Sequence, residues 1–344
     1  MIRTTFLLLL LLADSISGKT HMEDLLLSNP ELEIISVSNA DQLVEIFATI
    51  PVEPSAINDI AWSNDGQFLG VAGSFGVLLF PLDSLENVSS LYDGSTARCI
   101  AFGRRGKLVA AGIGHTIHVW DLELVKEVAV LKHFAVTSVD FSPDESILVS
   151  GSGDGTIQIW NTTDYEIIKT LNTGIDDIAV RDIEFSPDGN LLASGFNYGL
   201  YIWDVDTVLN DNAQESIIPI ISSGNTISID FNQEGSLLAF GGWAGDANLP
   251  TRILIFGSNI KEIYILDQRE YTNGVSFNMD GGILATGGDD EQIALWDVGK
   301  REKIIFLEGH SEEISALAFS PDKRILASSD FSGWIRLWGI PVKK

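Results

Sequence analysis

Residues able to do chemistry are few in this sequence, and their spacing suits neither catalysis nor metal binding. The five histidines (His21, His115, His118, His133 and His310) form no HExxH or similar cluster, and no G-x-S-x-G nucleophile motif is present. Cys99 is the single cysteine, which excludes an intramolecular disulfide and a cysteine-ligated zinc site, and it lies in an apolar run. We therefore expect no catalytic residue, no metal site and no cofactor.

Two weaker patterns have simpler explanations. The acidic runs at 176–177 and 289–291 lack the alternating ligands and the glycine of a calcium loop, so we interpret them as turn residues. Residues 13–20 (ADSISGKT) fit a loose phosphate-loop pattern, with Ala13 in place of the first glycine. A phosphate loop needs a surrounding parallel sheet, and the repeats described below occupy the chain after about residue 43. An active site assembled in a central channel from distant residues stays open as an alternative.

The charge of the chain argues against nucleic-acid partners. Its 344 residues carry 48 Asp and Glu against 21 Lys and Arg, a formal net charge of −27. Such a surface repels phosphate backbones and has no basic stripe to bind them. Because the acidic residues are spread over turns, we interpret them as a solvated surface.

The N-terminus has the layout of a secretory signal peptide. Arg3 precedes the apolar run Phe6 to Leu12, and small and polar residues follow up to Gly18. Cleavage is expected after Ser15 or Ser17, which predicts an extracytoplasmic or secreted protein. The run is too short for a permanent membrane span. Translation from Met22 would remove it and leave a cytoplasmic protein.

The rest of the chain repeats one unit. An aromatic residue ends a strand-like run and precedes a four-residue polar turn such as SPDG, at positions 62, 102, 141, 185, 231, 277 and 319. The steps between these aromatics are 40, 39, 44, 46, 46 and 42 residues. A strand with small residues follows each polar turn, and we expect its small side chains to make room for a neighbouring unit. A period in the low forties with about four strands per unit is typical of propeller blades.

A later strand of each unit alternates in polarity and ends on a second aromatic, at positions 80, 120, 160, 203, 256, 296 and 338. We therefore predict an all-β, seven-bladed β-propeller with four-stranded antiparallel blades. Residues 44–50 alternate like a strand before the first repeat, while no fourth strand follows Trp338. We expect this early strand to complete the last blade. The predicted divisions are a signal peptide at 1–17, an extension at 18–43 and the propeller at 44–340.

The dipeptides Trp120-Asp121, Trp203-Asp204 and Trp296-Asp297, with Gly309-His310 nine residues before Phe319, resemble those of the WD-repeat family. The resemblance covers about residues 44 to 339. The opening, with Asn39-Ala40 and Gln42-Leu43 before the first repeat, is similar to bacterial exported members.

In WD repeats a His, a strand Ser or Thr, a turn Asp and the Trp N–H form a buried hydrogen-bond chain. Here Ser332 stands where the turn Asp of the His310 repeat belongs, and Asp290 has no His before it. His133, in the repeat with Ser150, Asp154 and Trp160, is displaced by one residue. We therefore expect that no blade has the complete chain.

The resemblance implies a non-catalytic scaffold, monomeric, that binds an unidentified protein or peptide on a rigid face. The same resemblance implies that this face carries the turns between second and third strands and the loops that lead into each repeat. Five aromatic residues lie in or beside these segments, and we predict that they bind the partner: Phe75, Phe134, Tyr198, Trp243 and Phe331. Trp243 belongs to an insertion, Gly242–Pro250, which a neutral surface loop explains equally well. A hydrolase or glycan-binding propeller with a ligand in its channel is the alternative.

Overall fold

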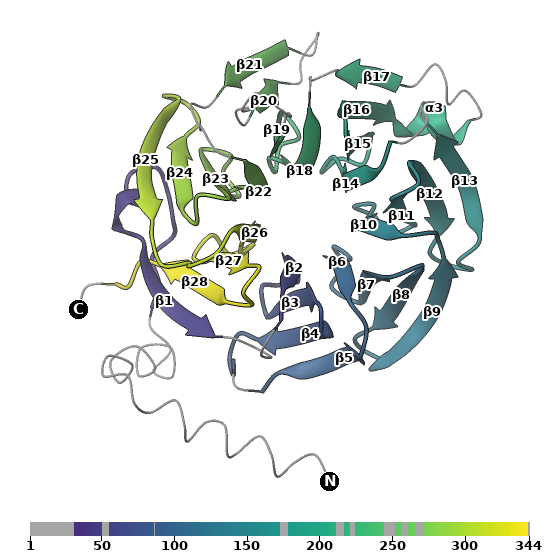
Figure 1. The fold of residues 1–344 in the computed structure, drawn as a ribbon, viewed down its shortest axis with the longest axis horizontal. Helices are drawn as coiled ribbons and strands as arrows, with labels where there is room; N and C mark the ends of the chain where they lie inside the picture. Colours follow the sequence, from purple (N-terminus) through teal and green to yellow (C-terminus); the bar gives the residue numbers. More distant parts are fainter. Residues whose placement is uncertain are drawn as a thin grey trace.

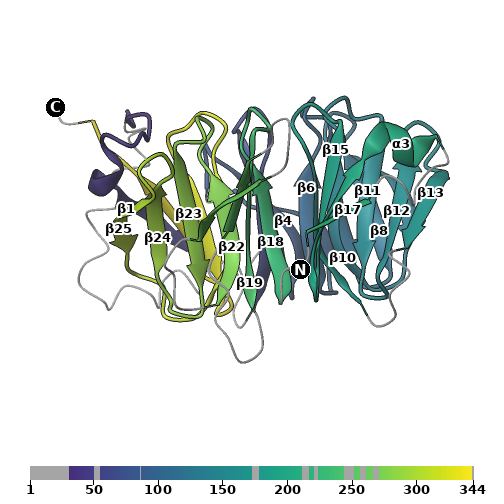
Figure 2. The ribbon, with the colours of Figure 1, turned by 90° about the horizontal axis from the view of Figure 1, so that it is seen from above.

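The computed structural model describes residues 31–49, 55–85, 87–172, 178–210, 217–220, 224–243, 252–255, 261–265 and 271–342. Across these ranges the strands form seven four-stranded antiparallel sheets arranged around a central axis (Figure 1). Figure 2, turned by 90° from this view, shows the sheets standing side by side. The predicted all-β propeller class is confirmed. The predicted signal peptide, with its cleavage sites and Met22, lies outside the described residues.

Six sheets, blades 1 to 6, each take four consecutive strands. Blade 1 has β2 (Ile57–Trp62), β3 (Phe68–Gly73), β4 (Gly76–Pro81) and β5 (Ser89–Asp93). Blade 2 has β6 (Ala97–Phe102), β7 (Leu108–Ile113), β8 (Thr116–Asp121) and β9 (Lys126–Lys132). Blade 3 has β10 (Val136–Phe141), β11 (Ile147–Ser152), β12 (Thr156–Asn161) and β13 (Ile167–Asn172).

Blade 4 has β14 (Val180–Phe185), β15 (Leu191–Phe196), β16 (Gly199–Asp204) and β17 (Ile217–Ile220), with the short helix α3 (Val205–Leu209) between the last two. Blade 5 has β18 (Asn225–Phe231), β19 (Leu237–Trp243), β20 (Arg252–Ile255) and β21 (Lys261–Ile265). Blade 6 has β22 (Thr272–Phe277), β23 (Ile283–Gly288), β24 (Ile293–Asp297) and β25 (Glu302–Leu307).

The remaining sheet, blade 7, is built from both ends of the chain. It contains β26 (Ile314–Phe319), β27 (Leu326–Asp330) and β28 (Ile335–Gly339), and its outer strand is β1 (Val44–Thr49). Strand β1 pairs with β28 antiparallel, from Val44 opposite Gly339 to Thr49 opposite Ile335. An ion pair between Arg336 and Glu45 adds to the joint. The strand before the first repeat thus completes the last blade, which leaves no unpaired edge on β28.

Residues 32–43 continue this closure as a strap over blades 6 and 7. Ile35 is fully buried in the apolar cluster between these blades, and its N–H donates to the Lys323 carbonyl at 2.7 Å. The 3-10 helix η2 (Ala40–Gln42) lies against β25. The strap therefore covers apolar surface that the last blade would otherwise expose.

The core lies between neighbouring blades. One apolar cluster joins Ile60, Val71 and Leu78 of blade 1 to Ala327 and Leu337 of blade 7. The small residues of each second strand make this approach possible, as predicted. A Cβ on Gly70 would lie 2.6 Å from the Ile100 side chain of blade 2, and one on Gly112 would lie 2.6 Å from Val136 of blade 3. These contacts are too close for any side chain larger than hydrogen.

Candidate functional site

The innermost strands β2, β6, β10, β14, β18, β22 and β26 surround a central channel of about 570 Å³. Each of these strands ends on the repeat aromatic, and residues alternate across it, so the third and fifth of the six residues that end on this aromatic share one face. That face lines the channel. The third residues are Asp59, Cys99, Ser138, Asp182, Ser228, Gly274 and Ala316, and the fifth are Ala61, Ala101, Asp140, Glu184, Asp230, Ser276 and Ala318.

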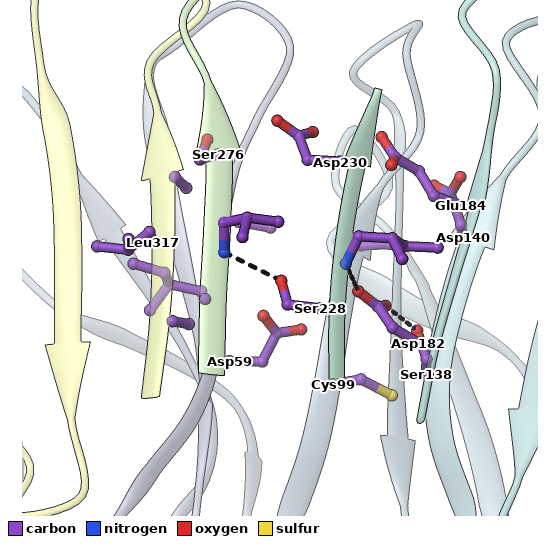
Figure 3. A pocket seen from close by; sticks show the side chains of 18 of the residues that line it. Asp59, Cys99, Ser138, Asp140, Asp182, Glu184, Ser228, Asp230, Ser276 and Leu317 are labelled. Carbon is purple, nitrogen blue, oxygen red and sulfur yellow. Dashed lines mark hydrogen bonds between the residues drawn. The ribbon is translucent and has the colours of Figure 1, made fainter. Parts of the chain in front are cut away.

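Four of the third residues, Asp59, Ser138, Asp182 and Ser228, bond their blade to the next one. Asp59 accepts the Ile100 N–H of blade 2 at 2.9 Å, and Asp182 accepts the Ile229 N–H of blade 5 at 2.9 Å. Ser228 continues the pattern by accepting the Val275 N–H of blade 6 at 3.1 Å. Ser138 donates to Asp182 at 2.9 Å, and Figure 3 shows this pair beside the channel.

The fifth residues form a second layer of the same kind. Asp140 accepts the Phe185 N–H of blade 4 at 2.8 Å, and Glu184 accepts the Phe231 N–H of blade 5 at 3.0 Å. Asp230 accepts the Phe277 N–H of blade 6, and Ser276 accepts the Phe319 N–H of blade 7 at 3.2 Å. These N–H groups belong to innermost strands and point to the side on which no further strand pairs. The carboxyl and hydroxyl side chains therefore take the place of a strand partner.

Burial raises the pKa of every one of these channel carboxyls. The pKa is about 7 for Asp59, about 7 for Asp140, about 6 for Asp182 and about 8 for Asp230. Burial also raises the pKa of Glu184 well above its usual value, and the charges of Asp230, Asp140 and Asp182 add to this rise. In each aspartate the accepted backbone N–H groups lower the pKa but do not offset burial.

The neighbouring Cys99 is not an activated nucleophile. It is buried, and burial together with the charge of Asp59 raises the pKa of its thiol, so the thiol stays protonated. The channel carboxyls were not among the site residues predicted from the sequence. Their signal was present, because an acidic residue directly precedes the repeat aromatic at Asp140, Glu184 and Asp230.

The predicted partner-binding residues lie at one edge of the blades. Strand direction alternates within a blade, so turns between second and third strands and loops before first strands meet at the same edge. Backbone bonds join them there: the Ser74 N–H donates to Ala56, Gly153 to Ala135 and Phe331 to Glu313. Phe75, Phe134, Tyr198 and Phe331 all belong to these segments.

These four side chains differ in exposure. Phe134 is 58% exposed, Tyr198 is 65% exposed and Phe331, which also lines the channel, is 43% exposed. Phe75 is partly buried and packs on the apolar cluster between blades 7 and 1. Trp243 is the last residue of β19, paired with Asn225, and its side chain and residues 244–250 of the Gly242–Pro250 insertion lie outside the described residues.

Phe134 is held in place although it is exposed. Its ring stacks on His115, with centroids 4.6 Å apart and planes 28° apart. The Nδ1 atom of His115 accepts the Ala135 N–H at 2.8 Å, which fixes the imidazole against the loop. Tyr198 lies beside Asn197, whose Oδ1 accepts from Arg181 of the channel wall at 2.7 Å.

The expectation that no blade has the complete buried hydrogen-bond chain is wrong. In blade 7, His310 bonds to Asp330 at 2.6 Å through Nδ1 and to Ser328 at 2.7 Å through Nε2, and Trp338 Nε1 donates to Ser328 at 2.8 Å. The acidic residue is Asp330, two residues before Ser332. It ends β27, and its other oxygen accepts the Ser332 N–H at 3.0 Å, so it shapes the turn as well.

Blade 3 has a related chain with one added member. His133 bonds to Ser150 at 2.7 Å, and Trp160 Nε1 donates to Ser150 at 3.0 Å. Thr156 bridges the imidazole to Asp154, at 3.0 Å and 2.6 Å. The displacement of His133 by one residue is therefore accommodated by the loop. In blades 4 and 6 the residues that the structure describes make only the last bond of the chain: Trp203 donates to Ser194 and Trp296 to Thr286.

The part of the chain that the structure describes contains no group of three or more His, Cys, Asp and Glu residues placed to hold a metal ion. Within the same residues, no helix has the length and apolar character required to cross a bilayer.

Four segments of the chain match a known repeat family. The family WD domain, G-beta repeat matches residues 125–161, 166–204, 261–297 and 301–339. Similar curated proteins include apoptotic protease-activating factor 1 of Rattus norvegicus, 24% identical over 81% of this chain and 22% of its own. The WD repeat-containing protein 91 homolog of Dictyostelium discoideum is 24% identical over 78% of this chain and 30% of its own.

The serine-threonine kinase receptor-associated protein of Gallus gallus is 24% identical over 69% of this chain and 65% of its own. The chain thus spans between 22% and 65% of the length of these relatives. All three are eukaryotic, so they lend no support to a bacterial exported type. The four matched segments are similar to repeats of the WD domain, G-beta repeat family, and the last of them contains the buried Asp–His–Ser–Trp chain of blade 7.

Proposed function

We propose that this protein is a non-catalytic scaffold that binds a protein or peptide on the edge carrying Phe134, Tyr198 and Phe331. The observation that carries the proposal is the stack of Phe134 on His115. An exposed ring gains little from the core, yet this one is fixed in orientation by its neighbour. A rigid exposed aromatic loses little entropy when a partner covers it, which is what a binding hot spot requires.

The channel carboxyls support a scaffold over a channel-sited hydrolase. Asp59, Asp140, Asp182, Glu184 and Asp230 each accept a backbone N–H of the next blade. Because these bonds hold neighbouring blades together, they account for the presence of acidic residues in the channel without a catalytic role. The name of one relative, serine-threonine kinase receptor-associated protein, also describes association with another protein.

The test compares partner capture by the intact chain and by single variants. Phe134→Ala and Tyr198→Ala remove exposed rings, so the melting temperature should change little. Truncation of a central hot-spot residue costs at least about 2 kcal/mol, so proteins captured from the native source should bind roughly 30-fold more weakly. Affinity purification with quantitative mass spectrometry, followed by titration of the captured protein, measures this loss.

Phe306→Ala provides the matched control. Phe306 is also an exposed aromatic, but it lies on the outer strand β25 of blade 6. This variant should retain the captured proteins at wild-type affinity. Equal binding by all three variants, or unfolding of both Phe134→Ala and Tyr198→Ala, would show that this edge is not the binding surface.

A further inference from the structure

The acidic residues of the channel are gathered on four inner strands. Asp59 lies on β2, Asp140 on β10, Asp182 and Glu184 on β14, and Asp230 on β18. Figure 3 shows these side chains around the open channel. The channel is narrow enough for the Asp182 charge on blade 4 to raise the pKa of Asp59 on blade 1.

Few opposite charges face them. Among the described residues, the other ionisable groups of the channel wall are Cys99 and three arginines, Arg98, Arg104 and Arg181. Arg104 lowers the pKa of Asp140 and also donates to the Pro187 carbonyl at 3.3 Å, while Arg181 binds Asn197. Strands β22 and β26 contribute only uncharged groups, among them Asn273, Ser276 and Ser315. The carboxylates therefore repel one another across the channel without full compensation.

We propose that the channel wall is a proton-responsive ring, whose carboxyls take up protons as the solution becomes mildly acidic while they keep their bonds to the next blade, so that the propeller becomes more stable. A protonated carboxyl still accepts through its carbonyl oxygen. Protonation therefore removes the repulsion and retains the bond. The new O–H can be donated within the ring, for example between Glu184 and Asp230, which interact electrostatically.

The direction of the effect follows from linkage. The pKa values of about 6 to about 8 in the folded ring lie above those of an unfolded chain, near 4. Stability from these groups is therefore complete below pH 4 and is lost as the pH rises through about 6 to 8. His133 opposes this trend, because burial lowers its pKa to about 4, so its contribution is lost as the pH falls below about 6.5. Variants of the ring separate the two effects.

The experiment measures the melting temperature of the full chain at pH 5.5 and pH 8.0. The double variant Asp182→Asn/Asp230→Asn keeps an acceptor oxygen at both positions and loses both charges. We expect it to melt several degrees higher than the wild type at pH 8.0 and to show a much smaller gain on acidification. Glu302→Gln, which removes an exposed carboxylate from the outer strand β25, should leave the wild-type pH dependence unchanged.

A second measurement reports on protons directly. Unfolding of the wild type at pH 7 should release protons, because carboxyls that are protonated in the ring become ionised in the unfolded chain. Potentiometric titration should show a smaller release for the double variant. If the double variant does not fold, Asp59→Asn alone should give a smaller change in the same direction. A wild type that releases no protons, or variants that follow its pH profile unchanged, would overturn the proposal.

Discussion

The buried hydrogen-bond chain of blade 7 predicts a specific cost for the substitution Ser328→Ala. The Ser328 hydroxyl is fully buried and bonds to two groups, Trp338 Nε1 at 2.8 Å and His310 Nε2 at 2.7 Å. Alanine fits the space but offers no partner, and both nitrogens belong to buried side chains. Two buried polar groups are then left unsatisfied.

The magnitude follows from the number of orphaned partners. Leaving one buried polar group without a partner costs about 1–3 kcal/mol, so Ser328→Ala, which leaves two, should destabilise the fold by about 2–6 kcal/mol. Ser194 in blade 4 is the matched comparison, since it is equally buried and its hydroxyl accepts from Trp203 Nε1 at 2.7 Å, with no histidine in its chain. Ser194→Ala should therefore cost about 1–3 kcal/mol.

Urea unfolding followed by tryptophan fluorescence measures both costs. The unfolding midpoint should fall further for Ser328→Ala than for Ser194→Ala, with an unchanged slope. Ser328→Thr, which keeps the hydroxyl, should recover part of the loss. Equal losses in the two alanine variants would refute the idea that the histidine–serine bond of blade 7 contributes separately to stability.

A deletion and a substitution test the closure of the ring and a turn of blade 2. Deleting residues 19–52 removes β1 and the strap, so the edge of β28 is left unpaired. Size-exclusion chromatography should then show aggregates. A truncated chain that melts like the full one would contradict this. Val125 is 86% exposed at φ 49°, a left-handed conformation that costs a β-branched residue about 1–2 kcal/mol. Val125→Gly should raise the melting temperature, and a lower value would disprove strain at this turn.

The repeat pattern predicts the propeller well because its signals are local. Polar turns, alternating strands and small second-strand residues are each encoded within one repeat. Closure by β1 was also predictable, since an alternating segment precedes the first repeat and the last repeat has no fourth strand. The short helix α3 was not predicted. Its N-cap is Asp204, whose side chain accepts the Thr207 N–H at 2.8 Å, so the acidic residue of a Trp-Asp pair acts there as a helix cap.

The sequence was less informative about the site because its contacts join different blades. The channel carboxyls bond to residues 41 to 47 positions away, a separation at which no local pattern indicates a partner. The blade 7 chain was missed because Asp330 comes before the position at which the turn acid was sought. Exposure was predicted for Phe75 as for Phe134, but the Phe75 ring packs on the cluster between blades 7 and 1.

The pairing of β1 with β28 has a consequence for synthesis on the ribosome. Glu45 is synthesised 291 residues before its partner Arg336. At about 5–20 residues per second, translation of this interval takes roughly 15–60 s. During that time β1 has no strand to pair with, while the intervening blades can form in order. Folding is thus completed only when the last repeat leaves the exit tunnel, and a factor that shields the nascent N-terminal strand would raise the yield of closed rings.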